Sequence, residues 1–399
     1  MPHVITRASR ISGTWVAILL AFTHLANDAL TAILGALLPT LEAQFSASPF
    51  LLSLLVAAFT ISSSASQPIL GSLAERVGLR QVAAIGVALA AVALGLLGVA
   101  STVLVLLLLL VLGGLGSAAL HPVSTSIVGG PASKNPSLAV GLFTAGGMVG
   151  FAIGPVLILA LIAHFGIQVT PWLMVPGLVF AVLVYLLLPD FEPHARRRTH
   201  RRLTIPAFHR QTVFLTLGAA LIGLAFLTYT SAVPLWLVNE YGIPADAPLL
   251  GWVLAAFSLA AALGAVVGGL SASRVGSVRT TVVSLLTAVG ALLVGLQLPV
   301  GGGTLIAGAV AGFMLFASQP LLVVAAQALN PGAPSAAAGM VLGIGSGLAG
   351  VLYIGSGILQ GLVGSVPVMQ LTYALLLPAA LLATRGLRAA LTPRRRTAP

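Results

Sequence analysis

The sequence contains an internal repeat with an offset of 198 residues, close to half of its 399 residues. The matched pairs are Gly71 and Gly269, Arg76 and Arg274, Gly78 and Gly276, Gly114 and Gly312, Pro122 and Pro320, Pro136 and Pro334, Ser137 and Ser335, and Gly141 and Gly339. A duplicated membrane unit is typical of transporters in which two bundles move around a central site. The repeat therefore predicts two equivalent halves.

The composition predicts that these halves lie in a membrane. Hydrophobic residues make up 58% of the chain and charged residues 6%, whereas about a quarter of the residues of a soluble domain are charged. A helix needs about 20 apolar residues to cross a bilayer. Glycine, proline and charged clusters divide the chain into twelve such stretches, at 14–40, 50–71, 81–99, 102–128, 138–164, 169–189, 211–238, 248–270, 280–298, 303–328, 336–363 and 367–385.

We therefore expect an all-α membrane protein with twelve transmembrane helices in two six-helix bundles related by pseudo-two-fold symmetry. The expected domains are an N-terminal bundle at 1–190, a basic cytoplasmic linker at 191–210, and a C-terminal bundle with a short basic tail at 211–399. The first hydrophobic stretch is too long for a removable leader and lacks a small-residue cleavage signal. We expect it to be the first transmembrane helix.

The net charge of +11 is explained by the position of the basic residues. They lie only in even-numbered connections and at the termini: Arg7, Arg10, Arg76, Arg80, Lys134, Arg196, Arg197, Arg198, Arg201, Arg202, Arg210, Arg274, Arg279, Arg385, Arg388, Arg394, Arg395 and Arg396. The connections on the other face carry the acids Glu42, Glu240 and Asp246. The positive-inside rule then places both termini and the Arg-rich linker at 191–210 in the cytoplasm. Anionic lipids, not nucleic acid, are the expected partners of these charges.

Several kinds of site are disfavoured by what the sequence lacks. It has no cysteine, which excludes disulfides and thiolate metal sites. A dinucleotide fingerprint at 345–350 lies inside an apolar helix and follows no strand, so it is a false match. The sequence has no His-Glu-x-x-His pair, no Gly-x-Ser-x-Gly elbow and no paired carboxylates within one expected span. We therefore expect a protein that is not an enzyme and that has no metal or other cofactor. We also expect a monomer, with protons as the coupling ion.

Asp28 is the carboxylate that we place near the middle of a membrane span. A charge there costs about 2.5 to 3.5 kcal/mol and usually marks an ion or proton pathway. His24, four residues earlier, and Thr31, three residues later, share its helical face, with Asn27 alongside. Burial disfavours the charged carboxylate and a nearby imidazolium favours it, so its protonation can follow access to either side. The alternative is a permanently hydrogen-bonded Asp28 that links helices.

His121 directly precedes Pro122 in the fourth expected helix, and Gln319 takes the equivalent place in the second half because 121 + 198 = 319. His121 either joins the proton pathway or caps a carbonyl freed by Pro122. Further polar residues are expected to line a substrate cavity: Asn27, Thr31, Gln67, Tyr229, Gln319 and Tyr353. Gly150, Gly154 and Pro155 predict a hinge in the fifth helix.

The segment Gly71-Ser72-Leu73-Ala74-Glu75-Arg76-Val77-Gly78-Leu79-Arg80 resembles the signature loop of the major facilitator superfamily, with Glu75 at the usual Asp position. A degenerate second copy lies at 269–279. Together with the repeat and the twelve spans, the resemblance covers the whole chain and implies the major facilitator fold. The two copies predict a cytoplasmic gate of Gly71, Glu75, Arg76, Gly78, Arg80, Gly269, Arg274 and Gly276. Glu75 and Arg76 are expected to pair across the halves when the outside is open.

A narrower resemblance, to drug exporters of the fosmidomycin resistance type, is carried by three segments. These are His24-Leu25-Ala26-Asn27-Asp28, then Leu37-Leu38-Pro39 with Phe45, and His121-Pro122-Val123-Ser124. The segment 150–155 is similar to the helix 5 motif of proton antiporters. The resemblance implies export of drugs or small metabolites by proton antiport with alternating access. Leu110 stands where the superfamily often has an arginine, which weakens the transfer of a phosphonate substrate.

Two alternatives to export remain open from the sequence. The same fold could work as a proton symporter that imports a small solute. An intramembrane enzyme or lipid-handling protein is the alternative from another class, and the absence of recognisable catalytic motifs argues against it.

Overall fold

The computed structural model describes residues 13–128, 136–189, 210–331 and 333–391, and these residues form helices and short connections. The N-terminal half comprises α1 (Gly13–Phe45), α2 (Pro49–Ala65), α3 (Gln67–Val77), α4 (Leu79–Gly95), the 3₁₀ turn η1 (Leu97–Val99), α5 (Val103–Val128), α6 (Pro136–Phe165), η2 (Ile167–Leu173) and α7 (Met174–Leu187). The C-terminal half comprises α8 (Arg210–Leu227), the π-helical turn η4 (Thr228–Ala232), α9 (Val233–Tyr241), α10 (Pro248–Val275), α11 (Ser277–Gly295), α12 (Gly302–Leu329), α13 (Pro334–Gly339), a second π-helical turn η5 (Met340–Ile344), α14 (Gly345–Val363), α15 (Ser365–Ala374) and α16 (Leu376–Leu391).

The described residues confirm the predicted number of membrane crossings. Eleven helical runs are long and apolar enough to span a bilayer, and α2 with α3 forms a twelfth run that bends by 44°. The bend lies at Ser66 and Gln67, directly before Pro68. Proline has no N–H to donate to the preceding turn, which favours a break at this point. The run continues to Val77, beyond the predicted boundary at residue 71. Its last turn carries the exposed Arg76.

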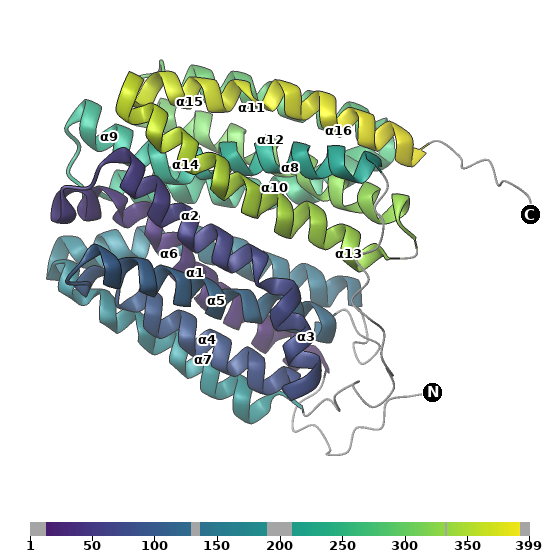
Figure 1. Cartoon of the computed structure of the whole chain (residues 1–399), viewed down its shortest axis with the longest axis horizontal. Coiled ribbons are helices and arrows are strands. Elements are labelled where there is room, and N and C mark those ends of the chain that lie inside the picture. The colour runs from purple at the N-terminus through teal and green to yellow at the C-terminus, as the bar shows by residue number, and fades with distance from the viewer. Residues whose placement is uncertain (1–12, 129–135, 190–209, 332, 392–399) are drawn as a thin grey trace, which may run out of the picture.

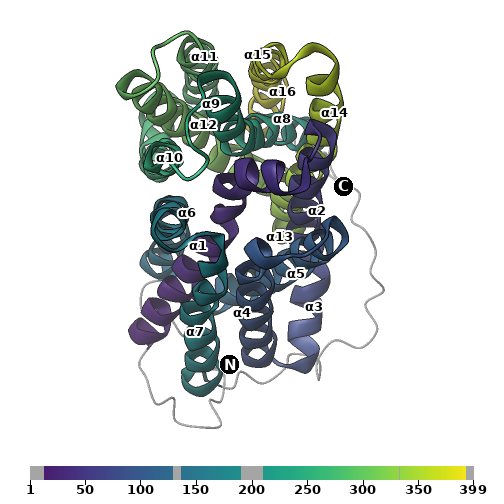
Figure 2. The same ribbon diagram turned by 90° about the vertical axis from the view of Figure 1, so that its left-hand side faces the viewer.

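The helices are grouped in two halves, as Figure 1 shows with the N-terminal half in purple to teal below the C-terminal half in green to yellow. Figure 2, turned by 90°, shows the same separation, with α1 and α2 adjacent to the other half. This arrangement confirms the expected two-bundle, all-helical fold. The linker at 191–209 and the basic residues at 7, 10, 134, 196–202 and 394–396 lie outside the described residues.

The charged residues define two ends of the molecule. The end that carries Arg76, Arg80, Arg274, Arg279 and Arg388, all at or near helix ends, is called the basic end below. The opposite end, called the acidic end, carries Glu42 near the end of α1, Glu240 near the end of α9, and Asp246 in the connection to α10.

Exposed aromatic residues lie near both ends of the helices. Trp15 and Tyr185 lie toward the basic end, and Trp172, Tyr241 and Trp252 lie toward the acidic end. Trp and Tyr are enriched at the two interfaces between a bilayer and water because their rings have an apolar body and a polar edge. Large aliphatic side chains are exposed between these levels, for example Leu263 and Val266 in the middle of α10. The described surface therefore has the layering of a membrane-spanning protein.

The two halves meet closely at the acidic end. A Cβ atom on Gly35 of α1 would clash with the carbonyl oxygen of Thr230 in η4. A Cβ on Gly357 of α14 would clash with Ser53 Oγ of α2. Farther out, Asn239 Nδ2 donates a hydrogen bond of 3.0 Å to Glu42 Oε2. Contacts this close between helices require small residues.

Toward the basic end, the halves separate. Added Cβ atoms on Gly269, Gly276 and Gly339 would meet no other atom within 4 Å. In Figure 1, the ribbons of α3 and α13, at the basic end of each half, lie apart. Among the described residues, the close contacts between the halves given above therefore lie toward the acidic end.

This conformation makes a prediction about Gly35. Because the chain has no cysteine, a Glu42→Cys and Asn239→Cys pair can report closure of the acidic end by disulfide formation. Gly35→Ala places a methyl group against the Thr230 carbonyl, and overpacking of this kind costs about 1 to 3 kcal/mol. We expect cross-linking to slow by roughly tenfold. Gly290→Ala, in open space on α11, is the control, and an unchanged rate in Gly35→Ala would contradict the described closure.

Candidate functional site

Close packing of α1 against α6 builds the candidate site. Glycines 146, 150 and 154 of α6 lie so close to α1 that a Cβ on each would clash with a carbonyl oxygen of Ala21, Leu25 or Ala29. A Cβ on Gly147 would clash with the His24 ring and would lie 2.7 Å from Asp28 Oδ2. This row of small residues therefore brings the α6 backbone directly against His24 and Asp28.

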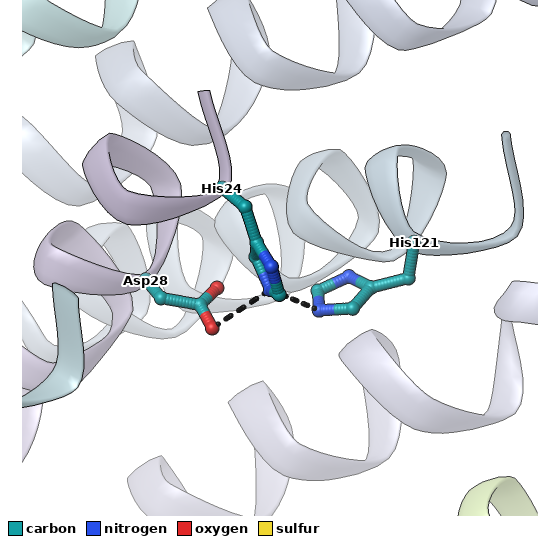
Figure 3. Close-up of side chains that lie close together, drawn as sticks. All are labelled: His24, Asp28 and His121. Carbon is teal, nitrogen blue, oxygen red and sulfur yellow. Dashed lines mark hydrogen bonds and ion pairs between the residues drawn. The ribbon is translucent and has the colours of Figure 1, made fainter. Parts of the chain in front are cut away.

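His24 lies between Asp28 and His121 in a chain of three ionisable side chains (Figure 3). Its Nε2 atom is 3.0 Å from Asp28 Oδ2 and 3.2 Å from His121 Nε2. The His24 ring stacks on the Phe143 ring of α6, with ring centroids 4.0 Å apart. The His121 ring lies edge-on to the His24 ring, with centroids 4.8 Å apart. His24 and Asp28 are buried and His121 is half-buried. The chain thus joins α1 to α5 inside the N-terminal half.

Backbone carbonyls determine which imidazole nitrogens carry hydrogen. His24 Nδ1 is 2.7 Å from the carbonyl oxygen of Phe143, and His121 Nδ1 is 3.1 Å from that of Ser117. A carbonyl oxygen only accepts hydrogen bonds, so both Nδ1 atoms are donors. In a neutral imidazole the other nitrogen then has no hydrogen. Without a further proton, three acceptor atoms would therefore face one another: the Nε2 atoms of His24 and His121, and Asp28 Oδ2. No hydrogen bond could then join them.

The hydrogen-bond pattern is complete only when the group holds additional protons. One proton on His24 Nε2 gives an imidazolium that donates to Asp28 and lies beside the His121 lone pair. With two protons, His24 Nε2 keeps its hydrogen and donates to His121 Nε2, and Asp28 carries the second proton as a neutral carboxylic acid. The group changes from net charge 0 to +1 between these two states. In each state His24 Nε2 donates one hydrogen bond within the group, to Asp28 in the first state and to His121 in the second.

Asn27 and Thr31 have different relations to this group. Asn27 Nδ2 donates to Asp28 Oδ1 and to Ser117 Oγ, both at 2.9 Å. Thr31 Oγ1 donates to the Asp28 carbonyl oxygen at 3.1 Å and also lines the central cavity. Asn27 therefore orients the carboxylate from within the N-terminal half. Thr31 is one helical turn from Asp28 and places the proton site next to the cavity.

His121 does not cap the carbonyl that Pro122 frees. Proline at 122 removes the N–H that would bond to the carbonyl of Ala118, whereas His121 bonds to the carbonyl of Ser117. Its other ring nitrogen faces His24. The structure therefore favours the first of the two interpretations of His121, as a member of the ionisable chain.

The three ionisable residues also meet a geometric criterion for a metal site, because their ligand atoms lie within 4.8 Å of one another. The contacts of 3.0 and 3.2 Å are hydrogen-bond distances that a proton completes directly.

A central cavity of about 210 Å³ lies between the halves. The N-terminal half contributes residues of α1, α2 and α6, and the C-terminal half contributes residues of α8, η4, α10 and α14. The lining residues are Thr31, Ala32, Leu34, Gly35, Val56, Phe59, Thr60, Ser63, Ser64, Phe151, Pro155, Gly223, Phe226, Leu227, Thr230, Ser231, Leu254, Ser258, Ser346 and Ala349.

Most of the residues expected in the cavity lie elsewhere in this conformation. Tyr229 is buried inside the C-terminal half, stacked on Phe257 at 4.3 Å, because its neighbours Thr230 and Ser231 take the cavity-facing positions of η4. Tyr353 lines a separate cavity of about 190 Å³ at the acidic end, with Glu42 and Trp236. These two placements correct the sequence-based expectation of a single cavity.

The two expected glutamines are also outside the central cavity, as are Asn27 and both histidines. Gln67 Nε2 donates to the Ser63 carbonyl oxygen at 3.1 Å, within the α2 to α3 bend, where Pro68 interrupts the helix. Gln319 is half-buried in α12 next to Pro320. Both lie toward the basic end, where the halves are apart, and this explains why neither contributes to the cavity.

The expected gate residues lie at the basic end. Glu75, Arg76 and Arg274 are exposed. Arg80 lies with its guanidinium 5.2 Å from the Tyr185 ring centre, within its own half. The two other glycines of the loop copies, Gly78 and Gly276, have positive φ of 133° and 89° at the turns between helices. Gly71 packs near Pro122, and Gly269 faces open space. The expected pairing of Glu75 and Arg76 across the two halves stays a prediction.

The residues of the expected hinge lie within α6, which is one helix from Pro136 to Phe165. Gly150 and Gly154 pack on α1, and Pro155 lines the central cavity and lies next to Gly251 of α10. Their role as a hinge stays a prediction.

Sequence reasoning missed Ser117, Phe143 and Gly147, which complete the proton site. Ser117 and Phe143 contact the histidines through backbone carbonyls, a role that leaves no residue-specific signal. Their side-chain contacts, of Ser117 Oγ with Asn27 and of the Phe143 ring with His24, depend on the packing of α1 against α5 and α6. Gly147 is one of several glycines in α6, and nothing local in the sequence distinguishes it from the others. The spacing of Gly147 and Gly150 around the α6 face was the available signal for close approach to α1.

Comparisons with known proteins agree with this architecture. Residues 20–354 match the family model described as Major Facilitator Superfamily. The fosmidomycin resistance protein of Escherichia coli (strain K12) is 26% identical over 364 residues, covering 89% of this chain and 87% of the relative. A protein of Bacillus subtilis (strain 168) named uncharacterized MFS-type transporter YfnC is also 26% identical, covering 89% of this chain and 88% of the relative.

Solved structures give the same result for the fold. A bacterial homologue of the human lysosomal transporter Spinster, in an inward-facing and unoccupied conformation, matches with a TM-score of 0.75 and 16% identity, over 97% of this chain and all of that chain. A mutant of the nucleoside transporter NupG matches with a TM-score of 0.76 and 15% identity, over 94% of this chain and all of that chain. The family match spans more than half of the residues, and these relatives are transporters, not enzymes. The chain is a multi-pass membrane transporter that belongs to the Major Facilitator Superfamily.

Proposed function

We propose that the chain exports a small molecule from the bacterial cytoplasm in exchange for protons, by alternating access. The observation that carries the proposal is the buried His24–Asp28–His121 chain, whose three ionisable side chains are in hydrogen-bond contact and can share one or two added protons. A buried ionisable group in a membrane span is costly and usually functional. The likeness to a fosmidomycin resistance protein supports export as the direction.

The positions of the proton site and the cavity support coupling between them. Asp28 is on α1, one turn from Thr31, which lines the cavity. The same helix carries Gly35, which packs on the other half at Thr230. A change in charge at Asp28 therefore acts on a helix that contacts both the cargo space and the closed interface. This continuity of one rigid element is a physical route for coupling.

The transport cycle follows from this arrangement. When the acidic end is open, the site takes a proton from outside and the cargo leaves the cavity. The added proton reduces the cost of returning the carboxylate to a closed, dry environment. When the basic end is open, the site releases its proton to the cytoplasm and the next cargo molecule enters.

One proton per cycle supplies enough free energy for export. A proton motive force of about 150 mV provides about 3.5 kcal/mol per proton. That free energy maintains a gradient of roughly 300-fold for an uncharged cargo, at 1.4 kcal/mol per factor of ten.

The proposal includes an orientation. The basic end faces the cytoplasm because basic residues between spans are retained on that side, and anionic lipid headgroups are the partners of its arginines. The unit of transport is a monomer, because the cavity and the proton site are complete within one chain.

The first test of this function is Asp28→Asn. The amide keeps a hydrogen-bonding side chain next to Asn27 and His24 but cannot carry the coupling charge. We expect normal expression and a proton-driven gradient that falls from roughly 300-fold to near unity. The measurement is proton release from acidified inside-out vesicles, read with a pH-sensitive dye, on adding a panel of toxic compounds that includes fosmidomycin.

Two results would contradict the proposal. If Asp28→Asn vesicles still build a cargo gradient from an imposed pH difference, Asp28 is not the coupling site. If cargo moves together with protons rather than against them, the protein is the symporter alternative. Thr40→Ser, on the same helix but outside the site, serves as the matched control and is expected to behave as the unmodified protein.

The second test is His121→Gln, which places in the first half the residue that the second half has at Gln319. Glutamine can donate to His24 Nε2 but cannot accept a transferred proton. We expect the variant to bind cargo normally while proton-driven transport falls by at least about tenfold. Binding is measured by calorimetry on purified protein and transport by the vesicle assay. Equal losses in binding and transport would instead indicate a structural role for His121.

A further inference from the structure

The central cavity carries information about the chemistry of the cargo. Among the described residues that line it, none is ionisable, although both halves contribute to it. Its polar groups are hydroxyls, on Thr31, Thr60, Ser63, Ser64, Thr230, Ser231, Ser258 and Ser346. The rest of the lining is aliphatic or aromatic. A cargo molecule must therefore find its polar partners among hydroxyl groups, without help from a charged side chain.

Four of these hydroxyl groups already donate their hydrogen atoms to backbone carbonyl oxygens. Thr60 Oγ1 donates to the Val56 carbonyl oxygen at 2.8 Å, and Thr230 Oγ1 donates to that of Phe226 at 2.9 Å. Ser63 Oγ and Thr31 Oγ1 each donate, at 3.1 Å, to a carbonyl three residues earlier. A hydroxyl has one hydrogen and two lone pairs. These four oxygens thus offer lone pairs to the cavity and have no free hydrogen to donate.

The aromatic residues of the lining also favour groups with a partial or full positive charge. Phe59, Phe151 and Phe226 line the cavity, and the rings of Phe151 and Phe226 lie edge to face with centroids 6.3 Å apart. The face of an aromatic ring carries partial negative charge and attracts cations and N–H groups. The cavity therefore combines hydrogen-bond acceptors with electron-rich rings.

We propose that the cavity binds a small, mostly apolar molecule that carries an amine or hydroxyl donor and no anionic group. This inference rests on the proposed function, because it names the cargo of the same transporter. An amine or hydroxyl satisfies the lone pairs of Thr60, Ser63 and Thr230, and its apolar part covers the phenylalanine rings. A carboxylate or phosphonate would lose its water, find no cationic side chain in the described lining, and face four hydroxyls whose hydrogens already bond to backbone carbonyls, which leaves part of its desolvation cost uncompensated.

A matched series of phenylethyl compounds tests the inference by binding alone. The series is 2-phenylethylamine, 2-phenylethanol, the acceptor-only methyl ether of that alcohol, 3-phenylpropanoate and 2-phenylethylphosphonate. Binding to the purified protein is measured by calorimetry and by the shift in thermal unfolding. We expect the amine and the alcohol to bind at least about tenfold more tightly than the ether and the two anions. Equal or tighter binding of either anion, or no binding by the amine and the alcohol, overturns the inference.

Two substitutions in the lining sharpen the test. Thr230→Val removes one acceptor oxygen at nearly constant volume, and we expect amine binding to weaken by roughly threefold to tenfold. Ser346→Lys places a cation in the half-buried lining, and we expect it to gain binding of 3-phenylpropanoate and lose binding of the amine. Ser346→Met is the control of similar length without charge. If Ser346→Lys folds, as its unfolding transition will show, and still prefers the amine, the electrostatic argument is wrong.

These outcomes are separable from those of the proposed function. The binding series requires neither vesicles nor a pH gradient. Selective binding of the amine and alcohol combined with no proton movement in vesicles would reject proton coupling and retain the cargo chemistry. Proton-coupled export of a phosphonate would do the reverse.

Discussion

The close approach of α1 and α6 is the physical constraint on which the site depends. Glycines on α6 allow its backbone to lie against Ala21, Leu25 and Ala29 of α1. At that distance the Phe143 carbonyl oxygen reaches His24 Nδ1 and determines which nitrogen of the ring faces Asp28. A helix with larger side chains at the same positions would hold α1 farther away, and His24 would lose the bond that orients it.

The buried carboxylate is stabilised by a polar network rather than by a single partner. Asp28 receives Asn27 on one oxygen and His24 on the other, and His121 extends the chain to α5. In a low-dielectric interior, each missing partner would leave a costly unpaired group. The network links three helices, as one of the two interpretations that the sequence left open expects. The other interpretation, exchange of a proton at Asp28, is part of the proposed function.

The two halves share a fold but differ in chemistry. The N-terminal half holds the ionisable chain, whereas Gln319 occupies the position equivalent to His121 in the C-terminal half. The C-terminal half has instead two π-helical turns, at 228–232 and 340–344, in helices that face the cavity. Such turns interrupt the regular helix and often occur at functional positions. Duplication thus provided the scaffold, and the separate evolution of each half provided the site.

By itself, the sequence determined the number of spans, the two halves, and the shared face of His24 and Asp28, because apolar length, repetition and helical periodicity are local properties. Only the tertiary structure decided which residues meet across helices. His121 lies 97 residues from His24, and their contact depends on the packing of α1, α5 and α6. The rotation of η4 likewise turned Thr230 toward the cavity and Tyr229 away from it. A π-helical turn changes the angle between successive side chains, so no helical pattern in the sequence could give that orientation.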